Sequence, residues 1–306
     1  MTPPGRDCVV QGDGVPLAVR DLGGTGRPVL LLHGGGRTLE DGTPLADELL
    51  PEHRVVSMDL RNHGLSGDGP WTWEAVARDV AAVVHALDLR EVVLVGHSLG
   101  GMLAAWCALE PGTCAAAVNL DGYGAGRPEQ YVGIDPVRHA ELTARLRAMT
   151  VASEHRMTAD DVEATAEALA AAGPALVTSF HRSLRPNGDG TSTPRPRPAQ
   201  VDAFTAAVEQ TLWLDVFSRT AVPLLLVNAV QPHTDDELPG EPWFAELANA
   251  YRAGLRRDLG ALAARHPLVA YGEVDATHFL HVERTTEVAA MIRSFLQARL
   301  AERVTA

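Results

Sequence analysis

One short stretch of the chain combines a potential nucleophile with the glycines that a sharp turn needs: Gly96-His97-Ser98-Leu99-Gly100. This G-x-S-x-G spacing follows an apolar run, residues 91–95, that predicts a strand, and it opens a segment, residues 99–109, that predicts a helix. A helix N-terminus presents free N–H groups and a positive dipole end, which favour a developing negative charge. We therefore expect Ser98 to be a catalytic nucleophile, the alternative being a plain strand-to-helix turn.

A serine hydroxyl is a weak nucleophile at neutral pH, so it needs a base, and the base needs a group that orients it. His278 follows the apolar run 268–274, which predicts the last strand, and we expect it to be this base. His281 is the alternative, although it begins the approach to the last predicted helix. The remaining histidines are expected on the surface or hydrogen-bonded in the core, and His97 is expected to pack near the turn.

A second glycine-rich loop, His33-Gly34-Gly35-Gly36, follows the apolar run 28–32, which predicts another strand. Glycines at this position let a backbone N–H approach the oxygen of a substrate. Together with the backbone N–H of Leu99, Gly34 and Gly35 are expected to form an oxyanion hole for acyl transfer. The alternative is a flexible loop with no catalytic part.

Short apolar runs alternate with helical patterns at both ends of the chain. The predicted strands span residues 8–11, 15–21, 28–32, 54–59, 91–95, 115–120, 222–229 and 268–274. The predicted helices span residues 44–50, 73–87, 99–109, 140–149, 158–172, 242–264 and 286–303, with one more inside 198–217. Apolar strands followed by helices favour a parallel sheet covered on both faces, so we expect an α/β fold.

The alternation stops between residues 122 and 220, where the patterns are mostly helical. We therefore interpret residues 1–121 and 221–306 as one α/β core domain and residues 122–220 as a helical insertion. Inside the insertion, residues 184–198 are rich in Pro, Gly, Ser and Thr, which is typical of a loop. Whether this loop is a mobile lid is left open.

The composition argues against several classes of partner. The formal net charge is −13 and no stretch gathers more than two or three basic residues, so neither nucleic acid nor an anionic membrane surface is expected. No His, Cys and Asp cluster shows metal-ligand spacing, and no G-x-G-x-x-G precedes a helix in a βαβ unit. We therefore expect no metal and no cofactor, and a small molecule as the substrate; the oligomeric state is left open.

Length and cysteine usage add to this picture. The chain has 306 residues, 46% of them hydrophobic, which is enough for one large domain with an insertion. The three cysteines, Cys8, Cys107 and Cys114, form no even-numbered disulfide framework, which favours a reducing compartment. The N-terminus lacks the pattern of a signal peptide, and no apolar run approaches the roughly 18 residues of a membrane span. We expect a soluble, cytoplasmic protein.

Four motifs, taken in order, resemble the α/β-hydrolase family over essentially the whole chain. They are residues 30–36 (LLLHGGG), 59–66 (DLRNHGLS), 96–101 (GHSLGG) and 277–283 (THFLHVE). The resemblance implies a mostly parallel eight-stranded sheet with helices on both faces, a helical cap inserted after the sixth strand, and a triad in the chain order Ser, Asp or Glu, His. The stretch 59–66 resembles the family's D-x-R-x-x-G-x-S loop, which we interpret as structural.

The acid of the triad is where the chain departs from the family pattern. Relatives usually carry it a few residues after the seventh strand, but this chain has Val230 and Gln231 there, and neither orients an imidazolium. Asp235 and Asp236 lie several residues further along. Asp121 ends the predicted sixth strand, where some relatives carry the acid, and a carboxylate at that sheet edge reaches the same histidine. We favour Asp121 and keep Asp235 or Asp236 as alternatives.

Three further residues are expected near the substrate. Many relatives have a tryptophan close to the position of Gly42, so a glycine there would widen the space near the site or loosen the loop. Trp213 and Phe217, in the insertion, are the expected liners of a pocket that selects an apolar acyl group.

These features favour a serine hydrolase that cleaves an ester, thioester or lactone of a fairly apolar small molecule through an acyl-enzyme. The same fold also supports other chemistry, namely C–C bond hydrolysis, oxidation without a cofactor, or cyclisation and rearrangement of natural products. A ligand receptor with little turnover is less favoured, because no triad position is visibly destroyed.

Overall fold

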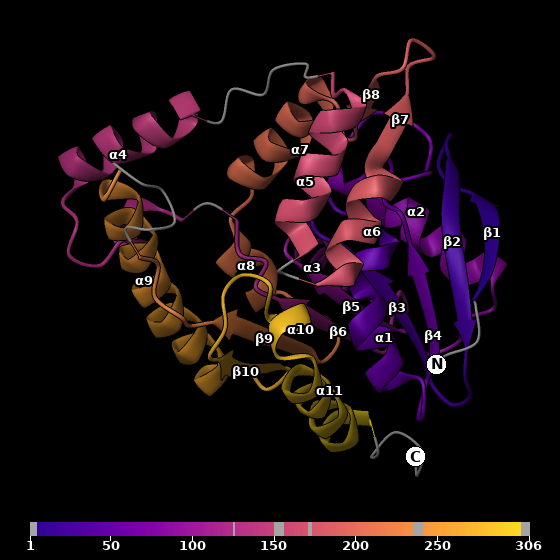
Figure 1. The fold of residues 1–306 in the computed structure, drawn as a ribbon. Helices are drawn as coiled ribbons and strands as arrows, with labels where there is room; N and C mark the ends of the chain where they lie inside the picture. The colour runs from indigo at the N-terminus through magenta and orange to yellow at the C-terminus, as the bar shows by residue number, and fades with distance from the viewer. Residues whose placement is uncertain (1–4, 125, 150–155, 171–172, 235–240, 301–306) are drawn as a thin grey trace.

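The computed structural model describes residues 5–124, 126–149, 156–170, 173–234 and 241–300, and a single eight-stranded sheet organises them (Figure 1). Its strand order is β1-β2-β4-β3-β5-β6-β9-β10. The strands are β1 (Arg6–Gln11), β2 (Pro16–Gly23), β3 (Pro28–Leu32), β4 (Arg54–Met58), β5 (Val93–His97), β6 (Ala116–Leu120), β9 (Leu224–Ala229) and β10 (Val269–Val274). Only the pairs β1–β2 and β2–β4 are antiparallel, so the predicted mostly parallel sheet is confirmed.

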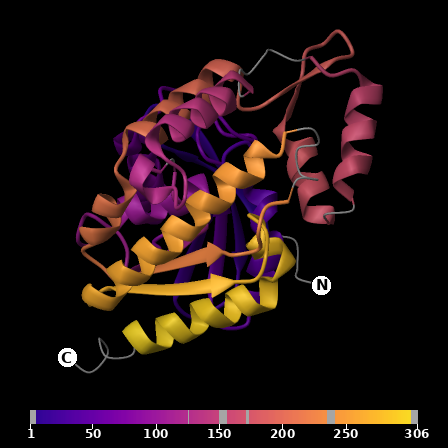
Figure 2. The same cartoon turned by 90° about the vertical axis from the view of Figure 1, so that its left-hand side faces the viewer.

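Helices cover both faces of this sheet. The helices of the core are α1 (Thr43–Leu49), α2 (Trp73–Ala86), α3 (Leu99–Cys107), α9 (Trp243–Arg265), α10 (Leu280–Glu283) and α11 (Thr285–Leu300). One apolar cluster joins the sheet to α2, α3 and α9, and a second joins it to α1 and α11. Figure 2 shows α9 and α11 on opposite sides of β9 and β10. The central strands β5, β6 and β9 are therefore buried along their whole length, as their continuous apolar sequences require.

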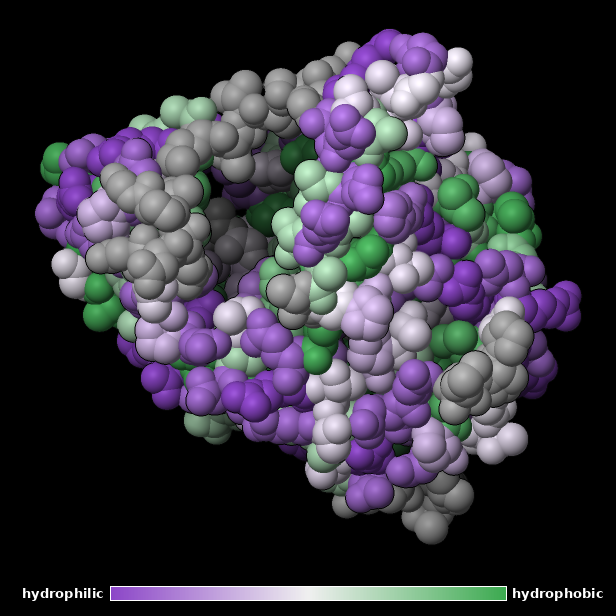
Figure 3. All heavy atoms as spheres, viewed as in Figure 1, coloured by the Kyte–Doolittle hydropathy of each residue, from purple (hydrophilic) through white to green (hydrophobic). Residues whose placement is uncertain are grey.

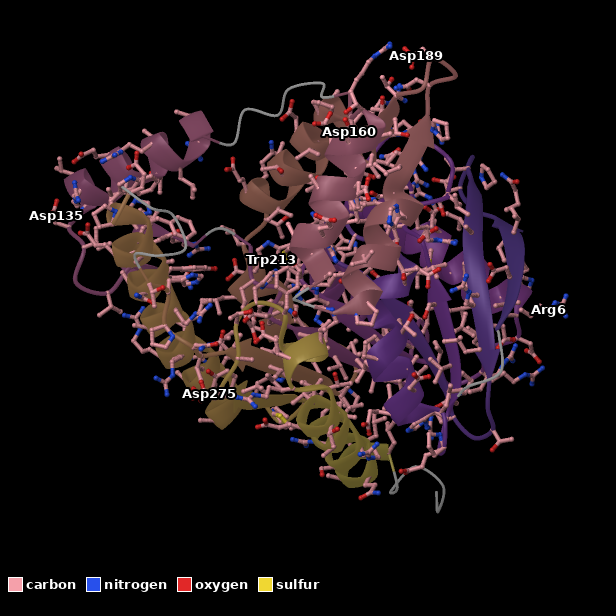
Figure 4. All side chains as sticks on the ribbon, in the orientation of Figure 1. Arg6, Asp135, Asp160, Asp189, Trp213 and Asp275 are labelled. Atoms are coloured by element: carbon pink, nitrogen blue, oxygen red, sulfur yellow. The ribbon has the colours of Figure 1, made fainter. Side chains whose placement is uncertain are left out.

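The segment between β6 and β9 leaves the sheet and forms a mostly helical layer. Its elements are the short 3₁₀ helix η2 (Pro128–Gln130), α4 (Pro136–Met149), α5 (Ala159–Ala170), α6 (Pro174–Ser183), β7 (Leu184–Pro186), β8 (Ser192–Pro194), α7 (Pro198–Gln210) and α8 (Trp213–Ser218). Helix α6 is missing from the sequence prediction, and the predicted helix inside 198–217 is two helices. The stretch 184–198 forms the β7–β8 hairpin, with Asp189 at its tip, and then enters α7 (Figure 4).

Two arginines of this inserted layer bind the loop of residues 59–66. The guanidinium of Arg182 donates to the Asp59 carboxylate over 2.9 Å, where both groups are nearly shielded from solvent. Arg195 is buried and donates to the backbone carbonyls of His63, Gly64 and Ser66. The loop of residues 59–66 thus anchors the inserted layer to the core through hydrogen bonds.

The structure also bears on the expectations about disulfides and membrane spans. Cys8, Cys107 and Cys114 are all free thiols, and burial raises the pKa of Cys107 and Cys114, which keeps both as unreactive thiols. Within the described residues, no helix combines the length and the apolar character that crossing a membrane requires.

Candidate active site

Ser98 sits on the sharp turn between β5 and α3. Its backbone has φ 52° and ψ −117°, an unfavourable conformation for a residue with a Cβ. Hydrogen bonds on both sides hold it there: the Ser98 N–H donates to the Leu120 carbonyl over 2.9 Å, and its own carbonyl accepts from Met102 N–H over 3.0 Å. The strained turn at this serine is therefore enforced by the neighbouring strand β6 and by the first turn of α3.

The glycines around Ser98 are required by close backbone packing. A Cβ on Gly96 would lie 2.0 Å from the Gly100 carbonyl oxygen, and a Cβ on Gly100 would lie 2.2 Å from the Leu32 carbonyl oxygen. A Cβ on Gly122, beyond the end of β6, would lie 2.1 Å from the carbonyl oxygen of Ser98 itself. The two glycines of the G-x-S-x-G motif thus let three backbone segments meet at the serine.

His278 and Asp121 meet at the same edge of the sheet. The Nδ1 atom of His278 lies 2.7 Å from Oδ2 of Asp121, and the other carboxylate oxygen accepts from the backbone N–H of Ala229 over 2.8 Å. The carboxylate is almost enclosed, with 9% of the side chain exposed, whereas the imidazole is 42% exposed. With Nδ1–H bound by the carboxylate, Nε2 is left as a proton acceptor. The alternative acids, Asp235 and Asp236, lie outside the described residues.

Ser98, Asp121 and His278 line one cavity of about 460 Å³. Its other walls include the apolar side chains of Met102, Ala248 and Leu255 and the polar side chains of Asn228, His233 and Arg252. In the space-filling view the surface is hollowed between α9 and the helices α5 to α7 (Figure 3). A cavity of this volume and mixed lining suits a small organic molecule.

The glycine-rich loop after β3 lies against the serine. A Cβ on Gly34 would lie 3.3 Å from Cβ of Ser98, and one on Gly35 would lie 3.7 Å from Cδ2 of Leu99. A backbone turn fixes the loop, because the Gly34 carbonyl accepts from Arg37 N–H over 3.1 Å. Leu99 is the first residue of α3, so its N–H belongs to the helical N–H groups that have no acceptor within the helix.

A second His–Asp pair, absent from the sequence prediction, lies directly behind the first. Nε2 of the buried His281 lies 3.3 Å from Oδ2 of the buried Asp41, which also binds Arg37 over 2.7 Å. His97 separates the two pairs: its ring centroid is 4.0 Å from that of His281 and 4.6 Å from that of His278. Nε2 of His97 lies 2.8 Å from the backbone carbonyl oxygen of His278, so His97 holds the main chain of that residue.

The surroundings of His97 and of Asp41 shift the pKa of each group. Burial, followed by the neighbouring imidazoles, lowers the pKa of His97 well below its usual value, so the ring is uncharged at neutral pH. Burial alone would raise the pKa of Asp41, but His281 and Arg37 together lower it. Because a carbonyl oxygen can only accept, Nε2 carries the proton of this neutral ring and donates it to the His278 carbonyl.

Ligand atoms of Asp41, His97 and His281 lie within 4.8 Å of one another, close enough to raise the question of a metal. Arg37 already occupies the Asp41 carboxylate, and the small cavity that these side chains line has a volume of only about 20 Å³. That is room for about one water molecule. The donor set is better suited to an internal polar cluster than to a divalent ion.

The three residues that the sequence suggested for substrate binding lie elsewhere. Trp213 (labelled in Figure 4) and Phe217 are buried on α8. They line a neighbouring cavity of about 150 Å³ that shares Tyr123, Tyr251 and Leu255 with the cavity of Ser98. Gly42 faces the side chain of Leu31, 3.2 Å from where its Cβ would stand. The structure brings none of the three to the wall of the Ser98 cavity.

The matching family model describes the alpha/beta hydrolase family and covers residues 29–291, so the chain belongs to this family. Among curated proteins it is similar to the esterase YbfF of Escherichia coli, 30% identical over 40% of this chain and 46% of that protein. It is also similar to a putative non-heme haloperoxidase of Mycobacterium phage D29, 34% identical over 46% of this chain and 51% of that protein. The matched regions thus span about half the length of these relatives.

Solved structures match over nearly the whole chain. The E-2-(acetamidomethylene)succinate hydrolase superposes with a TM-score of 0.70 at 21% identity, over 96% of this chain and 99% of that one. A thioesterase domain from the curacin biosynthetic pathway superposes with a TM-score of 0.67 at 19% identity, over 95% and 99%. At these identities the likeness establishes the fold.

Proposed function

We propose that the protein is a serine hydrolase that cleaves an ester, thioester or lactone of a small molecule through an acyl-enzyme. The observation that carries this proposal is the 2.7 Å contact between Asp121 and His278, made at the wall of a cavity that Ser98 also lines. The Asp121 carboxylate holds Nδ1–H of the imidazole, so Nε2 is available to take the proton of the Ser98 hydroxyl.

The reaction follows from these positions. As Nε2 of His278 takes the hydroxyl proton, Oγ of Ser98 attacks the substrate carbonyl carbon and forms a tetrahedral intermediate. His278 then gives the proton to the leaving oxygen or sulfur, and the acyl group stays on Ser98. Water, deprotonated by the same imidazole, cleaves the acyl-enzyme. Asp121 stays ionised throughout and stabilises the imidazolium.

The oxyanion of the intermediate is assigned to the N–H groups of Leu99 and of the Gly34–Gly35 turn. The observation that supports this assignment is the packing of the turn against Ser98 and Leu99, with the Cβ position of Gly34 3.3 Å from Cβ of Ser98. The loss of one oxyanion donor typically costs about 3 kcal/mol of transition-state stabilisation. The donors are backbone groups, which a side-chain substitution does not remove, so the serine provides the direct test.

The first experiment incubates the wild-type protein and Ser98→Ala with a fluorophosphonate and measures intact mass. We expect one adduct on the wild type and none on the variant, which shares its fold, together with p-nitrophenyl acetate hydrolysis by the wild type alone. An adduct on both proteins would place the activated nucleophile elsewhere. No adduct and no hydrolysis by a folded wild-type protein would overturn the proposal.

A second candidate function is oxidation without a cofactor, because one similar protein is named a putative non-heme haloperoxidase and another, 39% identical over 36% of this chain, is named a non-heme chloroperoxidase. Bromination of a diketone dye by peroxide and bromide tests it with the same two proteins. Turnover by the wild type that Ser98→Ala lacks would support this candidate beside hydrolysis, and no turnover would remove it.

A further inference from the structure

The cavity of Ser98 has one arginine in its wall, Arg252, which is half-buried on α9. Its guanidinium donates to the backbone carbonyl of Gln231, and Nη2 lies 3.0 Å from Nε2 of His233. Neither partner is an anion. A guanidinium has five N–H donors, so these two contacts leave three of them for a ligand.

Two arginines on α9 and on α4, which packs against α9, are paired with carboxylates. Arg256, one turn further along α9, binds Glu273 over 2.8 Å, and Arg145 of α4 binds Glu241 over 2.6 Å. Among the described residues, the carboxylate that lines the cavity is Asp121, and both of its oxygens are already bound by His278 and Ala229. Within the part of the chain that the structure describes, Arg252 thus faces the cavity without an anionic partner.

We propose that Arg252 binds a carboxylate of the substrate, so that the substrate class is esters or thioesters whose acyl group carries a second, free carboxylate. This inference rests on the proposed function, since it names the substrate of the same site. The planar guanidinium matches a carboxylate with two parallel N–H···O bonds, which fixes the orientation of the acyl chain as well as its position. The apolar wall of Met102, Ala248 and Leu255 suits the methylene chain between the two carbonyl carbons.

The charge of the whole protein gives a local cation particular value for such a substrate. With a net charge of −13, the molecule repels anions at long range, and a cation in the pocket offsets this repulsion for an anionic ester. Sites built to bind a polar group of the substrate reject analogues that lack it, because their own polar groups are then left unpaired in the complex. We therefore expect Arg252 to determine specificity rather than to take part in bond cleavage.

The test compares two matched esters, mono-p-nitrophenyl glutarate and p-nitrophenyl valerate, with the wild type, Arg252→Gln, Arg252→Lys and the control Arg256→Gln. The quantity measured is the ratio of kcat/KM for the charged ester to that for the neutral one. We expect Arg252→Gln to lower this ratio about 30-fold or more, mainly through KM, because a charge-assisted bidentate contact is lost. Arg252→Lys should recover part of the ratio, and Arg256→Gln should leave it as in the wild type.

A binding measurement keeps this proposal separate from the proposed function. Calorimetry with glutarate on Ser98→Ala and on Ser98→Ala/Arg252→Gln needs no turnover. Glutarate binding that only the first protein shows would support the anion site even if no ester were hydrolysed. Equal ratios for the wild type and Arg252→Gln, or glutarate binding that is equal or absent in both proteins, would overturn it.

Discussion

The molecule contains two His–Asp pairs whose histidines are only three residues apart in the sequence. His278 lies 2.7 Å from Asp121, and its ring is 42% exposed at the wall of the cavity that Ser98 lines. His281 lies 3.3 Å from Asp41, and both side chains are at least 97% shielded from solvent. The same pair of residue types thus occurs once in an open and once in a closed environment, with the two histidines on one short segment and the two aspartates far apart in the sequence.

The difference shows that access, rather than pairing, separates a chemical from a structural histidine. Both imidazoles have a carboxylate partner, but only His278 also borders the space in which a substrate fits. The second pair has Arg37 on its carboxylate and the uncharged His97 beside it, and His97 in turn binds the main-chain carbonyl of His278. Substitutions in the first pair should change rates, and substitutions in the second should change stability.

Replacing each of the two histidines in turn should give the largest difference in kcat between the open and the closed pair. His278→Gln removes the base and should lower kcat by about five to six orders of magnitude, as loss of the base does in other triads. His281→Gln leaves the base in place, so we expect kcat within about tenfold of the wild type, with a loss of about 1–3 kcal/mol of unfolding free energy from a buried polar group left unsatisfied.

Ester hydrolysis measures kcat of the two variants, and urea denaturation measures their unfolding free energies. If a well-folded His281→Gln protein lost most of its kcat while His278→Gln kept its activity, the base would be His281, and the His278–Asp121 pair would have the structural role. The circular dichroism spectrum of each variant provides the control for folding.

The two aspartates give the next largest contrast. Asp121→Asn keeps the shape of the side chain but no longer stabilises the imidazolium or its tautomer, so we expect kcat to fall about 10⁴-fold. Asp41→Asn weakens the contacts to Arg37 and His281 and should act mainly on stability. A loss below about tenfold for Asp121→Asn would move the acid to Asp235 or Asp236, which the matched substitutions Asp235→Asn and Asp236→Asn would then test.

The open pair follows from the sequence, whereas the closed pair does not. Asp121 comes directly after an apolar run and His278 four residues after another, and the carboxyl ends of parallel strands meet at one edge of the sheet. Asp41 lies in the short turn η1 (Leu39–Gly42), 240 positions before His281, and only the packing of α10 against η1 brings them together. No local pattern predicts such a contact.

The residues that line the cavity of Ser98 are likewise hard to predict from sequence. The sheet, the parallel direction of its strands and its two covered faces are predictable, because apolar strands and helices alternate along the chain. Their place in the inserted segment predicts Trp213 and Phe217 near the substrate, whereas the structure packs α8 against α3 and places both side chains in the wall of a neighbouring cavity. Arg252 carries no sequence signal, because one arginine in a 23-residue helix with several others gives no indication of which faces a cavity.

The smallest expected effect is the pH dependence of the unfolding free energy, which tests whether the buried histidines, His97 among them, are uncharged in the folded protein. Burial lowers the pKa of His33 to about 4 and of His63 to about 3, and it lowers the pKa of His97 well below 6.5. Below pH 6.5 the unfolded chain binds protons at these histidines while the folded chain does not. The unfolding free energy should therefore fall as the pH falls, by at most about 1.4 kcal/mol per pH unit for each histidine.

Asp41 acts in a different range of pH. Its pKa is lowered in the folded protein, so its contribution is complete above the unfolded value of about 4 and is lost only below it. Urea unfolding at pH 5, 6 and 7 should thus show a shallower pH dependence for His97→Asn than for the wild type, by about one histidine's share. Asp41→Asn should leave that slope unchanged over the same range. Equal slopes for the wild type and His97→Asn would mean that folding does not lower the pKa of His97, and the conclusion that burial keeps this ring uncharged would be disproved.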